Sequence, residues 1–360
     1  MKKHESKTVM IGEKFVGANH PVYIVFEAGP THDGLETAIK LVDMTKAAGA
    51  DAVKFQILKA DRMVSSREVM FSYTRLVDKT TGETELVTES LLEILKRREM
   101  RMEEWRELIQ YCHSIGVEFF STVSDEEEVR FLAENGVHTV KICSGDVSYH
   151  HLLRETAKFD LSVQLDTGSS SIGEVEFAVD VLEAHGCHNI ILNHCPSGYP
   201  AHLEGINLRV LPTLQQMFPY PVAFSDHSAG YEMDIAAVAL GANMIEKTIT
   251  LDRTIRGPEH IMSLEPGEAK GFVQAIRDLE VALGNTRRKL GPEEKHKRLT
   301  GRRSLFAAVD IAEGSQVDQG MLAYSRPGDG ISAEMDQHIL GRKAKRMIPT
   351  GTKLCFEDFA

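Results

Sequence analysis

The sequence lacks the features that mark secreted proteins, proteins with structural zinc sites and membrane-spanning proteins. Its five cysteines are scattered without CxxC spacing, a pattern that fits reduced thiols better than disulfides or structural zinc. The first residues contain no apolar stretch of signal-peptide length, and no later segment approaches the run of about 18 apolar residues that crosses a membrane. We therefore expect a soluble, cytoplasmic protein.

Basic residues are also fewer than acidic ones, with 41 Lys and Arg against 53 Asp and Glu. The formal net charge is -12 over 360 residues, which gives no general electrostatic reason to bind nucleic acid or a membrane surface. The glycine-rich segments DTGSSSIG and RPGDG do not match a P-loop or a dinucleotide-binding pattern. We predict no nucleic acid or membrane partner, and an anionic ligand would have to meet a local basic pocket.

The sequence does contain a regular alternation of short apolar runs and helix-period segments between Val22 and Leu283. This alternation is typical of successive βα units around a parallel sheet. Eight such units predict a (β/α)8 or TIM barrel, a fold of the α/β class. The predicted strands are Val22 to Ala28, Ala52 to Gln56, Glu118 to Thr122, Thr139 to Ser144, Leu161 to Gly168, Asn189 to Cys195, Val222 to His227 and Asn243 to Thr248.

The segments outside this pattern predict a two-domain chain. Residues 1–284 form the barrel domain, whose start, TVMIGEKFVG, is either a hairpin that plugs the barrel floor or a loose tail. The polar stretch from Lys59 to Met100 is too long for a structural connector, so it is a candidate lid or dimer contact. Residues 285–300 form a linker, and residues 301–360 form a small, mostly β domain with many turn glycines.

Polar residues end every predicted strand, where a barrel builds its active site. Any one of them would also be explained by helix capping or by contact with solvent. Their presence at all eight strands favours a shared site at the carboxyl ends. They are Glu27, Lys54, Gln56, Thr122, Lys141, Ser144, Asp166, His194, Ser225, Asp226, His227, Glu246, Lys247 and Thr248.

Two lysines, Lys54 and Lys141, lie inside apolar runs. An unpaired ammonium group is costly to bury unless it meets an anion, so the two predict a cradle for phosphate and carboxylate groups. Two alternatives remain open: structural ion pairs with Glu27 or Asp146, or a Schiff base on one lysine, which burial would favour. The hydroxyl residues that would complete the cradle are Thr122, Ser144 and Ser225.

Three histidines, His32, His194 and His227, lie in or just after predicted strands. They could converge at the barrel mouth as metal ligands or acid–base groups, although each alone could be a hydrogen-bonded structural residue. His227 is the strongest metal candidate. The carboxylates best placed for proton transfer or hydroxyl binding are Glu27, Asp146 and Glu259.

Several motifs follow one another along the chain: EAGPTHDG, VKFQ, FFSTVSD, KICSGD, DTG, HCPSGYPA, SDHSAG, EKT with GPEH, and RRSLFAA with SRPGDG. In this order and spacing they resemble the sialic acid synthase family across nearly the whole chain. The resemblance implies a TIM barrel joined to a C-terminal antifreeze-like (SAF) domain, in a domain-swapped homodimer where each SAF domain caps the partner's barrel. It also implies condensation of phosphoenolpyruvate with an open-chain N-acylmannosamine-type sugar, which yields a nine-carbon 2-keto-3-deoxy acid and phosphate.

The resemblance also assigns roles to individual residues. It makes Glu27 the catalytic glutamate and Tyr199 a pocket tyrosine. Arg326 becomes the arginine that reaches across the dimer to the N-acyl group of the sugar. The implied phosphoenolpyruvate-binding residues are Lys54, Gln56, Thr122, Lys141, Ser144 and Ser225.

The metal shell departs from the family pattern. The family holds a divalent metal, usually Mn2+, through two histidines; the first matches His227 and the second falls on Thr248. Because threonine is a poor ligand by comparison, His260 or Glu246 is the candidate replacement.

Other departures affect the substrate pockets. A carboxylate at Asp166, where serine is usual near the phosphate, would repel that phosphate unless it is turned away or paired with lysine. The remaining changes put the identity of the acceptor sugar in question. They are Asp146 for glutamate, Thr31 for asparagine, Ser197 for asparagine and Glu259 for aspartate.

We therefore predict a phosphoenolpyruvate-dependent synthase, a transferase that forms a carbon–carbon bond. Carbon-3 of phosphoenolpyruvate would attack the sugar aldehyde, polarised by a cation near His227, while Glu27 and Asp146 transfer protons. One alternative is a pyruvate-dependent Schiff-base aldolase or lyase of a sugar acid. The other is a catalytically altered homologue that binds a sugar acid.

Overall fold

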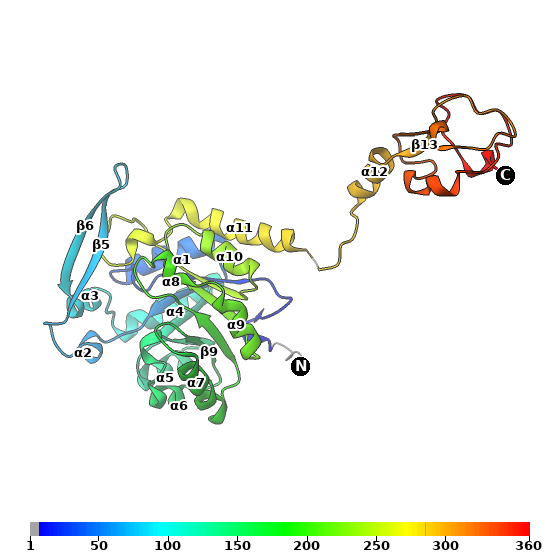
Figure 1. The fold of residues 1–360 in the computed structure, drawn as a ribbon. Coiled ribbons are helices and arrows are strands. Elements are labelled where there is room, and N and C mark those ends of the chain that lie inside the picture. Colours follow the sequence, from blue (N-terminus) through cyan, green and yellow to red (C-terminus); the bar gives the residue numbers. More distant parts are fainter. Residues whose placement is uncertain (1–6, 285) are drawn as a thin grey trace. The chain divides into compact units, whose positions relative to one another are not determined.

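The computed structural model describes residues 7–284 and 286–360, and its ribbon is drawn in Figure 1. Contacts within the chain divide it into two compact units, Met1–Gly284 and Asn285–Ala360. No helix in the described parts of the chain is long and apolar enough to cross a membrane.

The first unit contains a closed barrel of eight parallel strands, so the predicted fold is confirmed. The strands follow one another in chain order, and the last pairs with the first, with Thr248 opposite Glu27. Observed and predicted boundaries differ by at most two residues. The strands are β3 (Tyr23–Glu27), β4 (Ala52–Gln56), β7 (Glu118–Val123), β8 (Thr139–Ile142), β9 (Ser162–Asp166), β10 (Ile190–His194), β11 (Val222–Asp226) and β12 (Met244–Thr248).

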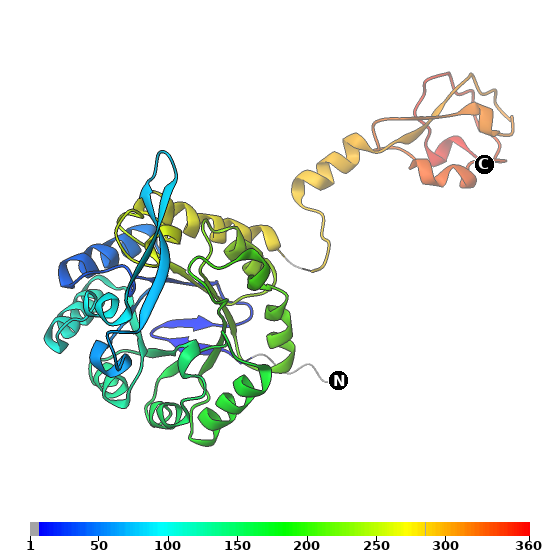
Figure 2. The same cartoon turned by 60° about the vertical axis from the view of Figure 1, so that its left-hand side comes forward.

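Helices form a ring around these strands (Figure 2). In the first of them the buried residues recur at helical spacing, and the helix ends at Gly49, whose φ of 83° is the left-handed conformation that favours glycine. Since helices cover the outside and side chains fill the inside, the strands read as continuous apolar runs. The helices of the first unit are α1 (Leu35–Ala48), α2 (Ala60–Met63), α3 (Leu91–Lys96), α4 (Met102–Ile115), α5 (Glu126–Glu134), α6 (His150–Thr156), α7 (Ile172–Ala184), α8 (Leu203–Ile206), α9 (Val210–Met217), α10 (Glu232–Ala239) and α11 (Pro266–Leu283), with 3-10 turns η1 (Ser144–Asp146) and η2 (His260–Met262).

The segment before the barrel is an antiparallel hairpin of β1 (Val9–Ile11) and β2 (Lys14–Val16). Val9, Ile11 and Val16 belong to the main hydrophobic core, and Lys14 Nζ lies 2.6 Å from a carboxylate oxygen of Asp51, just before β4. This ion pair places the hairpin at the amino-terminal end of the barrel, where Figure 2 shows it within the ring of helices.

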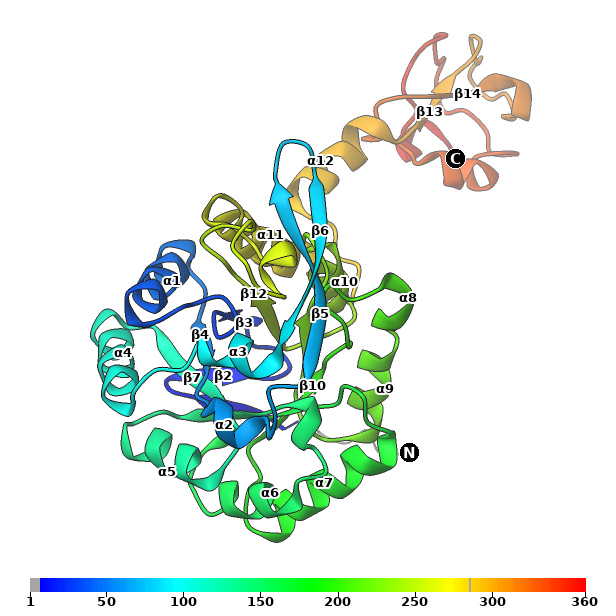
Figure 3. The same ribbon diagram turned by 90° about the vertical axis from the view of Figure 1, so that its left-hand side faces the viewer.

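The long polar stretch after β4 contains a second antiparallel hairpin, made of β5 (Met70–Asp78) and β6 (Glu83–Ser90). It stands out from the barrel in Figure 1, and Figure 3 shows it running across one end of the barrel. These two strands were not predicted, because their alternation is largely polar. Tyr73, Val87 and Ile94 form a small core of their own beneath the hairpin.

The second unit has its own hydrophobic core, built from residues such as Leu305, Ile311, Ile339 and Ile348. Two strands, β13 and β14, pair in an antiparallel sheet, with Leu305 opposite Tyr324. Its elements are α12 (Pro292–Gly301), β13 (Ser304–Ala307), η3 (Gln319–Met321), β14 (Leu322–Ser325), η4 (Ala333–His338) and η5 (Phe356–Asp358).

Candidate active site

A cavity of about 310 Å³ lies at the carboxyl ends of the barrel strands. Most of the residues that the sequence singled out meet there, because parallel strands bring their ends to one face. The predicted residues that line this cavity, called the barrel cavity below, are Glu27, Lys54, Gln56, Thr122, Lys141, Ser144, Asp146, Asp166, Tyr199, His227, Glu246 and Glu259.

Two buried lysines share one carboxylate in this cavity. Lys54 Nζ contacts the Glu27 carboxylate and lies 3.1 Å from Glu246 Oε1. Lys141 Nζ lies 2.8 Å from the same Glu246 oxygen and 3.1 Å from Asp166 Oδ1. The hydroxyl of Ser225 also donates to Glu246 Oε1, at 3.0 Å. Cations and carboxylates therefore alternate across the floor of the site.

These ion pairs keep both lysines charged. Burial alone would lower the pKa of Lys54, but Glu246 and Glu27 raise it above its ordinary value. Against the same cost of burial, Asp166 and Glu246 raise the pKa of Lys141 well above its ordinary value. The two lysines in turn outweigh burial at Glu246 and lower its pKa to about 2. Protonated lysines suit the binding of an anion, whereas a Schiff base requires a neutral amine.

Asp166, the aspartate in the DTG motif, points into the site and pairs with Lys141. Asn193 Nδ2 donates to its Oδ1, and burial raises the pKa of Asp166 despite the nearby lysine. The following glycine is needed for space, since a Cβ on Gly168 would lie 2.5 Å from both Cys195 O and Ser144 Oγ. The Asp166 carboxylate therefore faces the cavity and forms an ion pair with one lysine, Lys141.

Three further carboxyl groups differ in their surroundings. Glu27 Oε1 accepts a hydrogen bond from Gly29 N–H at 2.6 Å, while its other oxygen faces Lys54. Asp146 accepts from Cys143 Sγ at 3.1 Å, and burial raises its pKa. Burial also raises the pKa of Glu259, to about 7, although Arg98 opposes the shift. The cavity therefore holds a carboxylate in contact with a lysine, Glu27, and two carboxyl groups whose pKa is raised by burial, Asp146 and Glu259.

Arg98 lines the barrel cavity and was missed by the sequence analysis. It follows α3 in the insertion, is only 8% exposed, and its Nη1 lies 3.4 Å from Gln56 Oε1. A signal was present in the run LKRREM, a cluster of basic residues in an otherwise acidic chain. Because the run lies in a long polar stretch, the sequence did not indicate that one of its arginines, Arg98, is buried.

Some predicted residues lie outside the cavity lining. Ser225 sits behind it, against Glu246. Ser197 is exposed, and its hydroxyl lies 2.9 Å from Ser169 Oγ. Thr31 donates to the carbonyl oxygen of Ile249 at 2.7 Å. Arg326 belongs to the second unit.

The hypothesis that three histidines converge at the barrel mouth is wrong. His227 lines the barrel cavity, but His194 Nε2 is held by the Ile206 carbonyl at 2.6 Å, and His32 lines a different cavity together with His260. His32 and His260 lie after β3 and β12, in segments that follow the strand ends, and sequence spacing does not show which cavity such a residue lines.

Among the residues that the structure describes, no group of three potential metal ligands includes His227. Burial lowers the pKa of His227 to about 4 and its Nδ1 lies 3.1 Å from Pro196 O, so the imidazole is neutral and by itself suits a metal ligand. What it lacks, within the described chain, is partner ligands. His260 is elsewhere, and Glu246 is already engaged by two lysines. Thr248 is buried in β12 and does not contribute a strong ligand.

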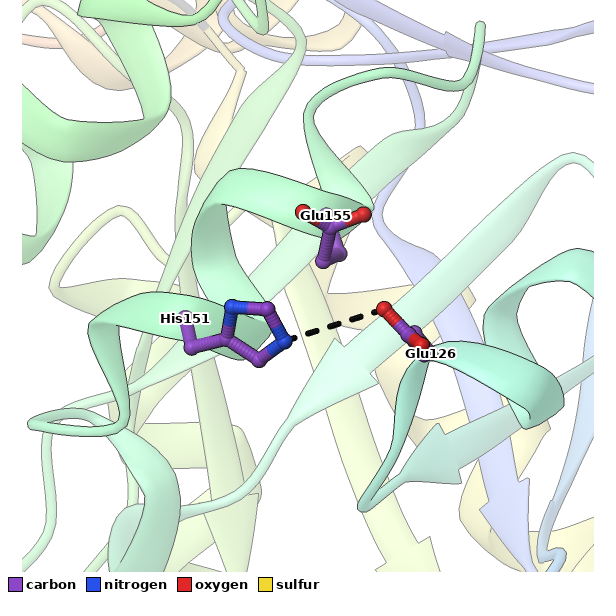
Figure 4. Close-up of side chains that lie close together, drawn as sticks. All are labelled: Glu126, His151 and Glu155. Atoms are coloured by element: carbon purple, nitrogen blue, oxygen red, sulfur yellow. Dashed lines mark ion pairs between the residues drawn. The ribbon is translucent and has the colours of Figure 1, made fainter.

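One other group has the composition of a metal site. Within residues 7–284 and 286–360, the three side chains close enough to share an ion are Glu126, His151 and Glu155. Figure 4 shows them on two helices, α5 and α6, outside the barrel. Glu155 already accepts from Lys158 at 2.6 Å, and the group does not line the barrel cavity. It therefore adds nothing to the site chemistry.

Comparison with known proteins decides the family. The NeuB family model matches residues 41–288, and the SAF domain model matches residues 302–360. The chain belongs to the NeuB family. It is therefore a synthase of the sialic acid synthase type, a group of phosphoenolpyruvate-dependent enzymes of the transferase type that generally need a metal.

Curated and solved relatives of this NeuB family member cover between 82% and 96% of its length. The N,N'-diacetyllegionaminic acid synthase of Legionella pneumophila is 35% identical over 96% of this chain and 97% of its own. The N-acetylneuraminate-9-phosphate synthase of Homo sapiens is 33% identical over 92% of this chain and 90% of its own. The crystal structure of the N-acetylneuraminic acid synthetase from Leptospira borgpetersenii has a TM-score of 0.71 at 30% identity, covering 82% of this chain and 96% of that one.

Proposed function

We propose that this enzyme condenses phosphoenolpyruvate with an open-chain N-acylmannosamine-type aldehyde to give a nine-carbon 2-keto-3-deoxy acid and phosphate. The observation that carries the proposal is the pair of buried, protonated lysines, Lys54 and Lys141, at the floor of the barrel cavity. Phosphoenolpyruvate supplies the phosphate and the carboxylate that such cations would hold. Thr122 and Ser144 line the same cavity and offer hydroxyl donors.

The carboxyl groups support a two-step reaction. Carbon-3 of phosphoenolpyruvate attacks the aldehyde carbon, and Asp146, whose pKa is raised by burial, donates a proton to the aldehyde oxygen. Glu27, held by Lys54, accepts a proton from the water that attacks carbon-2. The resulting phosphohemiketal collapses to the ketone and phosphate. Because the His227 surroundings do not fit a metal, no step is assigned to one.

The acceptor end of the site is assigned to other residues. We propose that Tyr199, Glu259 and the partner's SAF domain, through Arg326 in a domain-swapped homodimer, bind the sugar, while Gln56 stays with the donor. The ring of Tyr199 packs against His227 with centroids 4.8 Å apart, which sets one wall of the barrel cavity. Ser197, exposed at the edge, could contact only a bound sugar that extends beyond the cavity.

The test is a phosphate-release assay with phosphoenolpyruvate and a panel of N-acylated aldoses, each with added Mn2+, without it, and with a chelator. We expect release and a nine-carbon keto acid by mass spectrometry. Lys54→Met and Lys141→Met should each abolish turnover, whereas Lys59→Met, at a half-buried position outside the barrel cavity, should not. Activity in both lysine variants would refute the donor assignment, and borohydride trapping of pyruvate on the enzyme would instead support an aldolase.

A further inference from the structure

A second, smaller cavity adjoins the barrel cavity. It has a volume of about 160 Å³ and shares Ile94, Arg98 and Pro258 with the larger one. We call it the arginine cavity. Its other lining residues include Arg97, Arg256, His32 and His260.

Two buried nitrogen atoms in this lining, Arg98 Nε and His32 Nε2, have no hydrogen-bond partner within the described chain. Gly34 N–H donates to Nδ1 of His32 at 3.4 Å, so that nitrogen acts as an acceptor. The ring is neutral because burial lowers its pKa to about 4, and its proton therefore sits on Nε2. Both atoms are donors. Since an unsatisfied buried donor is costly, they call for a ligand rich in hydrogen-bond acceptors.

The charge of the arginine cavity points the same way. Glu89 accepts from Arg97 at 2.7 and 3.0 Å and from Arg256 at 3.2 Å, so one carboxylate serves two guanidinium groups. Arg98 adds a third cation, and the exposed Asp33 is engaged by Thr37. Within the described residues that line or support the cavity, positive charge exceeds negative charge, which favours an anion.

We infer that the arginine cavity binds an oxyanion, a phosphate or carboxylate group carried at the far end of the acceptor sugar. This inference rests on the proposed function and names the substrate class: an anionic rather than a neutral acceptor. Guanidinium groups match the planar edge of such a group, and the free N–H groups of Arg98 and His32 donate to its oxygens. The shared wall at Arg98 sets the oxyanion beside the cavity where the aldehyde reacts.

The test variant is Arg256→Gln. Arg256 lines the arginine cavity and not the barrel cavity, and its side chain is 55% exposed, so the fold tolerates its replacement. The matched control is Arg62→Gln. That side chain is 49% exposed, also pairs with carboxylates, and lines neither cavity.

Calorimetry on the full chain without phosphoenolpyruvate compares N-acetylmannosamine, its 6-phosphate and inorganic phosphate. We expect the sugar phosphate to bind more tightly than the neutral sugar, and Arg256→Gln to weaken its binding by about tenfold, the loss of one charge-assisted hydrogen bond. Arg62→Gln should change nothing. Equal affinity for both sugars, or no effect of Arg256→Gln, would overturn the inference. Inorganic phosphate that binds as tightly as the sugar phosphate would overturn the assignment to the acceptor.

Kinetics separate this inference from the proposed function. In the phosphate-release assay Arg256→Gln should raise KM for the sugar phosphate and leave KM for phosphoenolpyruvate unchanged. A rise in KM for phosphoenolpyruvate alone would show that the cavity holds the donor's phosphate, contrary to the inference. Absence of phosphate release with every acceptor would refute the proposed function, while the calorimetric result would still decide whether the oxyanion binds.

Discussion

Glu246 holds together the two lysines on which the proposed donor site depends. One of its oxygens accepts from Lys54, Lys141 and Ser225. The strand-end positions of the lysines predicted that they meet in the cavity, and one of the ion pairs considered for them, Lys54 with Glu27, is present. The anion cradle stays a prediction. The choice of Glu246 as shared partner could not be predicted, because β4, β8 and β12 are brought together only by closure of the barrel.

Glu259 makes stability depend on pH. Its pKa is raised from 4.5 to about 7, so between these values the folded protein keeps a proton that the unfolded chain has released. Stability from this group is therefore present at low pH and lost as the pH rises through the window. Glu259→Gln should remove up to about 3 kcal/mol of that loss. The measurement is the free energy of unfolding in urea, for the wild type and Glu259→Gln, at several pH values between 4.5 and 7. If the two free energies changed in parallel with pH, the raised pKa of Glu259 would be contradicted. Burial also raises the pKa of Glu128 to about 7, but this residue is present in both proteins and its effect cancels in the difference.

Among the elements, the two hairpins of the first unit serve different ends of the barrel. The β1–β2 hairpin buries apolar side chains at the amino-terminal end, one of the two outcomes that the alternating pattern TVMIGEKFVG allowed. The β5–β6 hairpin belongs to the insertion that delivers Arg98 to the opposite end. Its length suggested a functional role, but its strands were not predicted from a mostly polar alternation.

The β1–β2 hairpin should contribute measurably to the stability of the barrel unit. Ile11 is 1% exposed, whereas Met10 beside it is 57% exposed. We expect Ile11→Ala to lower the free energy of unfolding by about 2 to 4 kcal/mol, because it leaves a cavity in the core. Met10→Ala should have little effect. Equal urea midpoints for the two variants would show that the hairpin does not close the core.

Glu89 anchors the insertion, residues 59–100, through hydrogen bonds from Arg97 and Arg256. Hydrogen bonds from Arg97 lower its pKa to about 2, and Tyr73 OH also donates to it at 2.6 Å. Glu89→Gln should lower the free energy of unfolding by about 1 kcal/mol, a small amount because solvent screens partly exposed ion pairs. It should also increase the rate of proteolysis of the β5–β6 hairpin. Glu85→Gln, which breaks an exposed pair with Arg75 in the same hairpin, is the control. Identical cleavage rates would argue against an anchoring role.

At the scale of the whole molecule, the chain consists of two units with separate cores. The barrel unit contains the cavity and every lysine and carboxylate assigned to the chemistry. Arg326 is exposed and lies in the other unit. Its proposed role in acceptor binding therefore depends on assembly.

Arg326→Ala in the full chain tests that role. We expect KM for the acceptor to rise by about tenfold, the value of one hydrogen bond to a charged donor, with KM for phosphoenolpyruvate unchanged. Arg342→Ala, an equally exposed arginine of the same unit, should leave both values unchanged. Steady-state kinetics that show no difference between the two variants would remove Arg326 from the acceptor site.

The sequence by itself determined the barrel, the order of its strands and the identity of most cavity residues, because apolar periodicity and strand-end polarity are local properties of the chain. Tertiary structure alone decided which charges meet. The sharing of Glu246 by two lysines, the pairing of Asp166 with Lys141, and the separation of His32 and His260 from His227 all depend on loop direction and barrel closure. Charge interactions act over a few ångströms in space, and sequence spacing does not encode those distances.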